Sequence, residues 1–302
     1  MSEPIRLTLA YPNEKQQRFL ECTAKYIAFG GARGGGKSWA VRTKAILLAL
    51  GYAGIRLLIV RRTYQELESN HIRILRPQLA QVAEYKAATR TFTFLNGSTL
   101  EFGYCASDGD MDRYQGAEYD VIFLDECTQL REQWMRQFAA CLRGVNDFPK
   151  RIYYTCNPGG PGHSYIKRLF IDRRFEPGEN PDDYVFIPAR VTDNKALLAA
   201  QPDYLKQLEA LPRRLRQAWL EGRWDIFQGQ VFSEFTDDPT HYADRRFTHV
   251  IPAFDIPREW RVYRSYDFGY AKPFSCGWWA VDHDGVLYRI LELYGCTSTP
   301  NE

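Results

Sequence analysis

The feature that most constrains this chain is a glycine-rich turn between an apolar run at 26–29 and a helical pattern at 38–50. Glycines let a backbone curl so that successive N–H groups point inward, and the helix that follows adds the positive end of its dipole. Such a turn forms a cradle for phosphate groups. The residues with the G-x-x-x-x-G-K-S spacing are Gly31, Ala32, Arg33, Gly34, Gly35, Gly36, Lys37 and Ser38.

This turn predicts a site for ATP and Mg²⁺. Lys37 is expected to contact the β- and γ-phosphates, and the Ser38 hydroxyl is expected to be a ligand of the metal. A flexible turn that matches the spacing by accident is the alternative. The strand pattern before the turn and the helical pattern after it favour the phosphate-binding interpretation.

The composition places few limits on function. A chain of 302 residues is long enough for one large core or two domains, and a formal net charge of +2 gives no global sign of a nucleic-acid-binding protein, although a local basic patch stays open. The seven cysteines are scattered without a C-x-x-C pair, as expected for reduced thiols. The sequence shows no signal-peptide pattern and no apolar run of membrane-spanning length, so we expect a soluble intracellular protein with no membrane partner.

A buried strand that ends in two carboxylates is the second chemical landmark. The run at 121–124 is apolar throughout, and Asp125 and Glu126 follow it directly. An acidic residue in this place can hold the Mg²⁺ that Ser38 binds, and its neighbour can accept a proton from an attacking water. Two solvated carboxylates are the plainer interpretation, but the phosphate-binding turn makes it less attractive. We therefore predict Asp125 as a metal ligand and Glu126 as the general base.

Two further strand ends carry polar residues. Arg61 and Arg62 follow an apolar run and either face phosphate or lie on the surface, and the surface is slightly favoured. The run at 151–156 leads through Thr155 and Asn157 into a loop rich in Pro and Gly. A polar group there can sense the γ-phosphate or orient the water, and an ordinary turn is the alternative.

Upstream of the glycine-rich turn, a helix is predicted to open at Pro12 and Asn13. Gln16 or Gln17 in this helix can contact the edge of an adenine base, because an amide side chain offers both a donor and an acceptor. A solvated helix face explains the two glutamines equally well.

The connecting segments give weaker signals. Residues 65–82 have the pattern of a helix interrupted by Pro77, and residues 91–102 form two alternating runs around an Asn-Gly turn, which predicts a hairpin. Residues 163–224 have the pattern of short helices around Pro188, Pro202 and Pro212.

The last part of the chain, from residue 229 on, is aromatic and β-prone and predicts a three-stranded meander. Asp267 lies near the end of its first strand. A carboxylate in this place can be a metal ligand for phosphodiester hydrolysis, although a strand-end aspartate standing alone is more often structural.

In their order along the chain, these motifs resemble the large subunit of tailed-phage terminases, the motors that package and cut viral DNA. The similarity extends over nearly the whole length. Its segments are Gln16-Gln17, residues 31–38, Arg61-Arg62-Thr63, Asp125-Glu126, Thr155-Cys156-Asn157-Pro158, Gly222-Arg223-Trp224 and Ser265-Tyr266-Asp267-Phe268-Gly269-Tyr270.

The resemblance implies an α/β fold with a mostly parallel sheet and three parts. These are a P-loop ATPase core of the additional-strand class at 1–160, a lid or linker at 161–228 and the first strands of an RNase H-like nuclease domain at 229–302.

The resemblance also implies residue roles. Gln16 or Gln17 would contact adenine, and Arg33 would lie near the γ-phosphate and act in catalysis with Lys37 and Glu126. Thr155, Cys156 and Asn157 would couple hydrolysis to motion, and Asp267 would be the first carboxylate of a nuclease that uses Mg²⁺ or Mn²⁺.

Members of this family translocate double-stranded DNA into a procapsid. The resemblance therefore implies portal protein and a small terminase subunit as partners, and a homo-oligomeric ring as the assembled form. The expected location is the host cell cytoplasm, with transient docking on the procapsid portal.

The nuclease departs from the family pattern, because a two-metal site needs several oxygen ligands and the family has further carboxylates well beyond Asp267, whereas this sequence ends at Glu302. We therefore expect the nuclease to be incomplete and inactive. Two alternatives to a packaging motor are a helicase-like ATPase that depends on nucleic acid but not on a capsid, and a non-catalytic ATP-binding scaffold.

Overall fold

The computed structural model describes residues 7–225, 235, 237–246, 248–268 and 273–295. The chain divides into two units, residues 1–229 and residues 230–302, and each is described by itself. None of the helices in the described ranges combines the length and the apolar character that a bilayer crossing needs.

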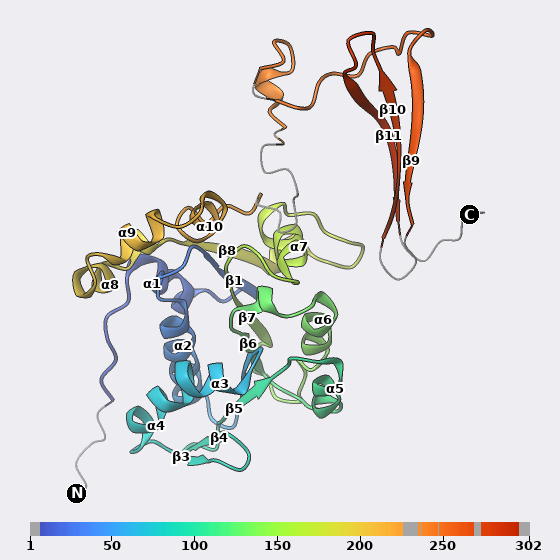
Figure 1. Cartoon of the computed structure of the whole chain (residues 1–302). Helices are drawn as coiled ribbons and strands as arrows, with labels where there is room; N and C mark the ends of the chain where they lie inside the picture. The colour runs from blue at the N-terminus through green and yellow to red at the C-terminus, as the bar shows by residue number, and fades with distance from the viewer. Residues whose placement is uncertain (1–6, 226–234, 236, 247, 269–272, 296–302) are drawn as a thin grey trace, which may run out of the picture. The chain divides into compact units, whose positions relative to one another are not determined.

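An eight-stranded sheet with the order β3-β4-β5-β2-β6-β7-β1-β8 forms the centre of the first unit (Figure 1). The six strands from β5 to β8 in this order are parallel, whereas β3 and β4 pair in antiparallel fashion. β7 lies between β6, which leads to the two carboxylates, and β1, which leads to the glycine-rich turn. The strands are β1 (Tyr26–Gly31), β2 (Arg56–Arg61), β3 (Ala83–Lys86), β4 (Thr91–Phe94), β5 (Thr99–Tyr104), β6 (Val121–Leu124), β7 (Arg151–Cys156) and β8 (Tyr184–Ala189).

Helices cover both faces of this sheet (Figure 1). Successive strand residues point to opposite faces, so that Ile27 and Phe29 join one buried apolar cluster with α1, α2 and α4, whereas Ala28 joins the other with α6 and α7. Burial on both faces explains why the middle of these parallel strands is mostly apolar, and why β6 is apolar throughout. The helices are α1 (Glu14–Glu21), α2 (Lys37–Gly51), α3 (Tyr64–Leu67), α4 (Arg73–Leu79), α5 (Asp108–Met111), α6 (Glu132–Ala140), α7 (His163–Ile166), α8 (Lys195–Ala200), α9 (Tyr204–Glu209) and α10 (Arg213–Trp219).

Shorter helical turns complete the first unit. Two of them, η1 and η4, are π-helical, and the others are 3₁₀ turns. They are η1 (Glu68–Ile72), η2 (Asp112–Tyr114), η3 (Cys127–Gln129), η4 (Lys167–Ile171), η5 (Pro181–Asp183) and η6 (Val191–Asp193).

The helical segment after β2 differs from its prediction. It was expected to break at Pro77, but α4 runs through Pro77, and the irregularity is instead the π-helical turn η1 that joins α3 to α4. A proline inside a helix removes one backbone hydrogen bond. Leu75 and Leu79 are fully buried on either side of it, so tertiary packing holds the helix together there.

The prediction of short helices is confirmed around Pro202 and Pro212, where α8, α9 and α10 lie. It is wrong around Pro188, which lies in strand β8 and pairs with Gly30 of β1. β8 is the edge strand of the sheet, where a residue without an N–H group is tolerated. Segment 161–228, which the resemblance implied to be a lid or linker, therefore also supplies a strand to the core sheet. The implied boundary at 228–229 lies outside the described residues.

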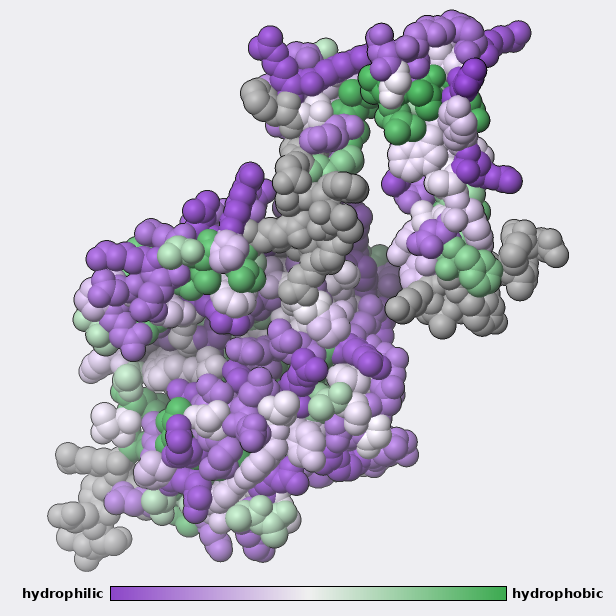
Figure 2. Space-filling view, viewed as in Figure 1, coloured by the Kyte–Doolittle hydropathy of each residue, from purple (hydrophilic) through white to green (hydrophobic). Residues whose placement is uncertain are grey.

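The second unit contains the predicted three-stranded meander. It consists of β9 (Arg261–Asp267), β10 (Phe274–Val281) and β11 (Leu287–Gly295), which are antiparallel, and a 3₁₀ turn, η7 (Pro239–His241). Hydrophobic residues are visible on the surface of this unit in Figure 2. Phe268, Leu287 and Tyr294 are each more than half exposed.

Candidate active site

The glycine-rich turn adopts backbone conformations that favour glycine. Gly31, Gly34 and Gly36 have φ angles of +122°, +77° and +75°, in the region that residues with a Cβ rarely adopt. A Cβ at Gly36 would also lie 2.3 Å from Nε2 of Gln16. Gly36 is the N-cap of α2, so the turn presents the positive end of this helix as predicted.

Segment 161–228 bonds directly to this turn. The N–H of Ala32 donates to the carbonyl oxygen of Ala189 at 2.9 Å. The Asn194 side chain, which also caps α8, donates through Nδ2 to the carbonyl oxygen of Gly34 at 2.7 Å. The turn is therefore fixed by residues more than 150 positions later in the chain.

Arg33 also contacts this later segment. Its backbone N–H donates to the carbonyl oxygen of Trp219 at 2.8 Å, and its guanidinium carbon lies 3.4 Å from the centre of the Trp219 ring. Trp219 is the last residue of α10. The arginine expected near the γ-phosphate is thus stacked on α10 in this structure.

Lys37 lies at the base of the turn and is only 8% exposed. Its Nζ donates to the carbonyl oxygen of Ala32 at 2.5 Å and to Oδ1 of Asn157 at 2.8 Å. Burial lowers the pKa of Lys37 from its ordinary value. The contact with Asn157 links the turn to the loop after β7.

The turn and the acidic strand end come together, as predicted. Oγ of Ser38 lies 3.3 Å from Oδ2 of Asp125. Glu126 adopts a left-handed backbone conformation with φ of +53°, and its side chain is 40% exposed. A residue other than glycine in this conformation stores strain, which is common at functional sites.

Thr155 connects the two carboxylate residues to β7. Its Oγ1 donates to Oδ1 of Asp125 at 2.5 Å and accepts from the backbone N–H of Glu126 at 2.8 Å. One hydroxyl therefore fixes both the side chain of Asp125 and the backbone of Glu126. Cys156 is buried, and the carbonyl oxygen of Asn157 accepts a hydrogen bond from Oγ1 of Thr128 at 2.9 Å.

Arg61 belongs to this site, so the preference for a surface position is wrong for Arg61, although Arg62 is exposed. Arg61 is 4% exposed, because β2 neighbours β6 in the sheet and ends beside the two carboxylates. Its Nε lies 2.7 Å from Oδ2 of Asp125, and its Nη2 lies 3.3 Å from Oε1 of Glu126.

A second buried side chain, His71 of η1, also contacts Asp125, with Nε2 2.8 Å from Oδ2. Burial acts to raise the pKa of Asp125, but the hydrogen bond from His71 and the charge of Arg61 outweigh it and hold this pKa well below its usual range. The carboxylate is therefore ionised, as a magnesium ligand must be.

The residues present fit a magnesium ion that is shared with phosphate. Neighbouring ligands of octahedral Mg²⁺ lie about 2.9 Å apart, and the Ser38 and Asp125 oxygens are 3.3 Å apart. The described residues contain no cluster of three or more His, Cys, Asp or Glu side chains that could hold a metal by themselves. A site of one hydroxyl and one carboxylate suits Mg²⁺ that takes its other ligands from phosphates and water.

A cavity of about 420 Å³ lies beside the turn. Gln16 lines it together with residues 11–15 and 192–196. The Gln16 side chain donates through Nε2 to the carbonyl oxygen of Gly36 at 3.1 Å and accepts from the N–H of Asn13 at 2.9 Å. Gln17 is exposed and bonds to Glu21 instead, so of the two glutamines only Gln16 lies at this cavity.

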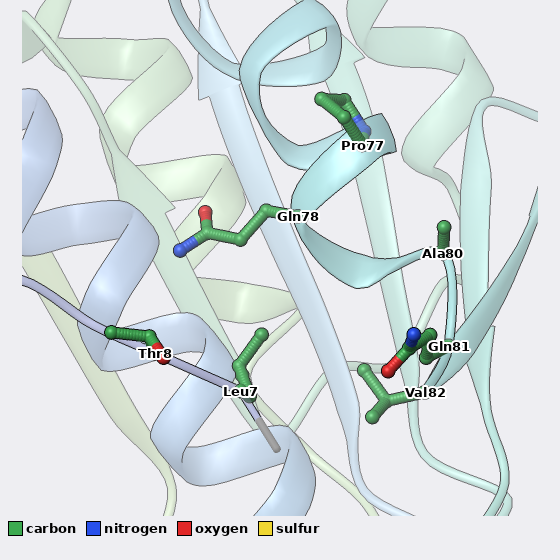
Figure 3. A pocket seen from close by; sticks show the side chains of 7 residues that line it. All are labelled: Leu7, Thr8, Pro77, Gln78, Ala80, Gln81 and Val82. Atoms are coloured by element: carbon green, nitrogen blue, oxygen red, sulfur yellow. The ribbon is translucent and has the colours of Figure 1, made fainter. Parts of the chain in front are cut away.

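A second hollow of about 340 Å³ is shown in Figure 3. No charged side chain and no residue of the glycine-rich turn lines it, so it does not fit a triphosphate. Its lining residues are Leu7, Thr8, Pro77, Gln78, Ala80, Gln81 and Val82.

Asp267 is the last residue of β9, is exposed and pairs with Ser275 of β10. The following Gly269 and Tyr270 of the predicted motif lie outside the described residues. The described part of the second unit brings no set of metal ligands around Asp267, so its nuclease role stays a prediction.

Comparison with known families decides the assignment of the chain. The profile of the family described as terminase large subunit, T4likevirus-type, N-terminal, matches residues 28–236, which is more than half of the chain. The chain belongs to this family. The resemblance inferred from the motifs, and with it the assignment to DNA-packaging motor subunits, is therefore confirmed.

Solved structures of terminases share the fold. The large terminase of a thermophilic bacteriophage matches with a TM-score of 0.59 and 20% sequence identity, over 94% of this chain and 68% of that chain. The same terminase in complex with ATP-gamma-S matches with a TM-score of 0.56 and 20% identity over the same shares. The ATPase domain of the Thermus phage P74-26 large terminase has a TM-score of 0.52 and 16% identity, over 71% of this chain and 94% of that chain. No curated protein matches the sequence.

These matches confirm the α/β P-loop fold with a mostly parallel sheet. They leave the RNase H-like nature of the second unit as a prediction.

Two residues of this candidate site, His71 and Asn194, are not predicted by the sequence, and Arg61 is predicted there only as the less favoured alternative. Arg61 carried a signal, because it ends a buried strand next to the predicted site in an open α/β sheet. His71 and Asn194 carried none, since each is a single polar residue in a segment without a motif.

Proposed function

We propose that this chain binds ATP with Mg²⁺ and hydrolyses it to translocate double-stranded DNA into a procapsid, as a motor subunit that acts with a portal protein and a small terminase subunit. The observation that carries the proposal is the approach of Ser38 and Asp125 to 3.3 Å, with Lys37 at the same turn. It joins the phosphate-binding turn to the acidic strand end in one site.

Lys37 and the inward-facing turn bind the triphosphate. The amine of Lys37 forms charge-assisted hydrogen bonds to phosphate oxygens in exchange for those it makes with Ala32 and Asn157. Ser38 and Asp125 would hold Mg²⁺, which supplies charge neutralisation on the phosphoryl oxygens when it is bound. The solved complex of a related terminase with ATP-gamma-S supports a nucleotide site in this fold.

Glu126 orients the attacking water and accepts its proton. Thr155 holds the Glu126 backbone, and Arg61 lies 3.3 Å from its carboxylate, so the side chain is kept at the site although it is partly exposed. Arg33 stabilises charge on the transferred phosphoryl group once it leaves the Trp219 ring.

The adenine base occupies the cavity beside Gln16. The cavity volume of about 420 Å³ is within the range of small-molecule sites, and Gln16 ties the cavity wall to Gly36 of the turn. Asn194, on the part of the wall that segment 161–228 supplies, ties the cavity to the turn through its hydrogen bond to Gly34.

Segment 161–228 acts as the lid that transmits hydrolysis to DNA, and residues 1–160 act as the ATPase core. Asn157 senses the state of Lys37, and the loop after it reaches His163, whose Nδ1 accepts from the N–H of Gly159 at 2.9 Å. The His163 ring stacks on Trp224 with 5.2 Å between centres. A movement of Asn157 can therefore be transmitted through His163 to Trp224 at the end of the lid.

The test is the ATPase rate of the purified chain with and without double-stranded DNA. Non-sequence-specific DNA is expected to raise the rate, and the rise is expected to disappear as salt increases, because phosphate contacts are lost with counterion competition. A rate that depends on single strands and is accompanied by unwinding would indicate a helicase. ATP binding without turnover would indicate a scaffold.

A further inference from the structure

His71 is a buried ionisable residue to which the proposed mechanism gives no role. It is 0% exposed, and its Nε2 lies 2.8 Å from Oδ2 of Asp125. A carboxylate can only accept, so Nε2 must carry the proton and donate it. Nδ1 is buried and has no hydrogen-bond partner within the described structure.

The backbone that carries His71 is built in an unusual way. His71 belongs to the π-helical turn η1, which adds one residue to a helical repeat and so rotates the residues after it by about 100° relative to a regular helix. Nη1 of Arg42, in α2, donates to the carbonyl oxygen of Asn70 in the same turn. The turn is therefore anchored to the helix that begins with Lys37 and Ser38.

The hydrogen bonds on Asp125 are unevenly distributed between its two oxygens. Oδ2 accepts from Nε of Arg61 at 2.7 Å and from His71 at 2.8 Å, and Ser38 is a longer contact at 3.3 Å. Among the side chains that the structure describes, Oδ1 accepts from Thr155 only. Arg61 and His71 therefore contact Oδ2 together and fix the carboxylate in one orientation.

A purely structural role explains this arrangement poorly. An apolar side chain of similar volume would fill the same space without leaving Nδ1 as a buried acceptor that lacks a partner, which is unfavourable. The imidazole differs from such a side chain in one useful property, which is its N–H bond to Asp125.

We propose that His71 is a positioning residue of the magnesium–nucleotide site, which holds the Asp125 carboxylate in the orientation that binds Mg²⁺ beside Ser38. The proposal rests on the proposed ATP site. Groups that hydrogen-bond to a metal ligand commonly change metal affinity by about 10- to 100-fold when they are removed. His71 acts through Asp125 and does not itself touch the nucleotide.

The experiment measures the affinity of a fluorescent ATP analogue with Mg²⁺ and with EDTA. His71→Met keeps the volume and removes the donor, whereas His71→Gln can place an amide N–H close to the position of Nε2. His71→Met is expected to lower the Mg²⁺-dependent affinity by about tenfold or more and to leave the affinity in EDTA unchanged. His71→Gln is expected to restore most of the loss.

Two further variants keep the test sharp. Ile72→Val, at the neighbouring fully buried position of η1, controls for general loosening of the turn and is expected to bind like the wild type. His71→Asn, which is shorter and does not reach Asp125, replaces His71→Met if that variant does not fold.

The outcomes separate the two proposals. If the wild type shows no Mg²⁺-dependent binding, the proposed ATP site itself is wrong. The role of His71 is overturned if the wild type binds with Mg²⁺ and His71→Met or His71→Asn binds equally well. It is also overturned if these variants lose as much affinity in EDTA as with Mg²⁺, or if they bind no more weakly than His71→Gln.

Discussion

Glu126→Gln is expected to lower the ATPase kcat by about 10²- to 10⁴-fold and to leave nucleotide affinity within about threefold. Glutamine keeps the size of the side chain but cannot accept the proton of the attacking water. The backbone bond to Thr155 and the strained conformation of residue 126 do not depend on the carboxylate, so the variant is expected to fold normally. Steady-state turnover and the binding of an ATP analogue measure the two quantities separately.

Glu132→Gln provides the matched control for this variant. Glu132 lies in the exposed first turn of α6 and pairs with Arg136 at 2.8 Å, away from the glycine-rich turn. The Glu132→Gln variant is expected to turn over ATP like the wild type. Unchanged turnover in Glu126→Gln would show that another group takes the proton, and lost binding would show that Glu126 is structural.

Lys37→Met is expected to weaken triphosphate binding by about 10- to 100-fold, because one charged hydrogen-bond donor to the phosphates is lost. It is expected to lower kcat by a further factor of about 10² to 10³, because the same donor stabilises charge in the transition state. Lys37 is buried and donates to Ala32 and Asn157, so its amine is already directed into the turn. Methionine keeps the length of the chain without the charge. Calorimetric titration with ATP-gamma-S and the ATPase rate measure the two effects.

Lys25→Met is the control for loss of a lysine. Lys25 directly precedes β1 and is about half exposed at its side chain, with a distant ion pair to Asp183 at 3.8 Å and its Nζ 5.2 Å from the centre of the Tyr26 ring. Its removal is expected to leave both quantities unchanged. A Lys37→Met variant with wild-type affinity for ATP-gamma-S would mean that the turn does not bind the triphosphate.

The glycine-rich turn and the acidic strand end could be predicted because each is a contiguous pattern of residue types. Glycine permits the positive φ angles found at Gly34 and Gly36, and α2 starts at Lys37 directly after them, although segment 161–228 then holds the turn in place. The approach of Ser38 to Asp125 follows from a general rule as well, since the carboxyl ends of parallel strands lie along one edge of the sheet.

Other parts of the fold depend on pairings between distant segments. β8 pairs with β1 although more than 150 residues separate them, and its Pro188 argues locally against a strand. Only its place at the sheet edge removes this conflict. Segment 161–228 therefore looked entirely helical in sequence.

The positions of several site residues depend on packing in the same way. Arg61 has the same residue type as the exposed Arg62, and only the side of β2 on which it lies brings it to Asp125. His71 reaches Asp125 through a π-helical turn, for which the sequence carries no known pattern. Arg33 was predicted from its place in the motif, but its stacking on Trp219 depends on a helix nearly 200 residues later.

The central claim is that Ser38 and Asp125 bind the same magnesium ion, and a double-mutant cycle tests it most directly. Affinity for ATP-gamma-S is measured with Mg²⁺ and with EDTA for the wild type, Ser38→Ala, Asp125→Asn and the double variant. If the ion is shared, the loss of binding free energy in the double variant with Mg²⁺ is smaller than the sum of the two single losses by about 1 kcal/mol or more. This coupling vanishes in EDTA. Losses that add to within about 0.3 kcal/mol, or a coupling that persists in EDTA, would contradict the account.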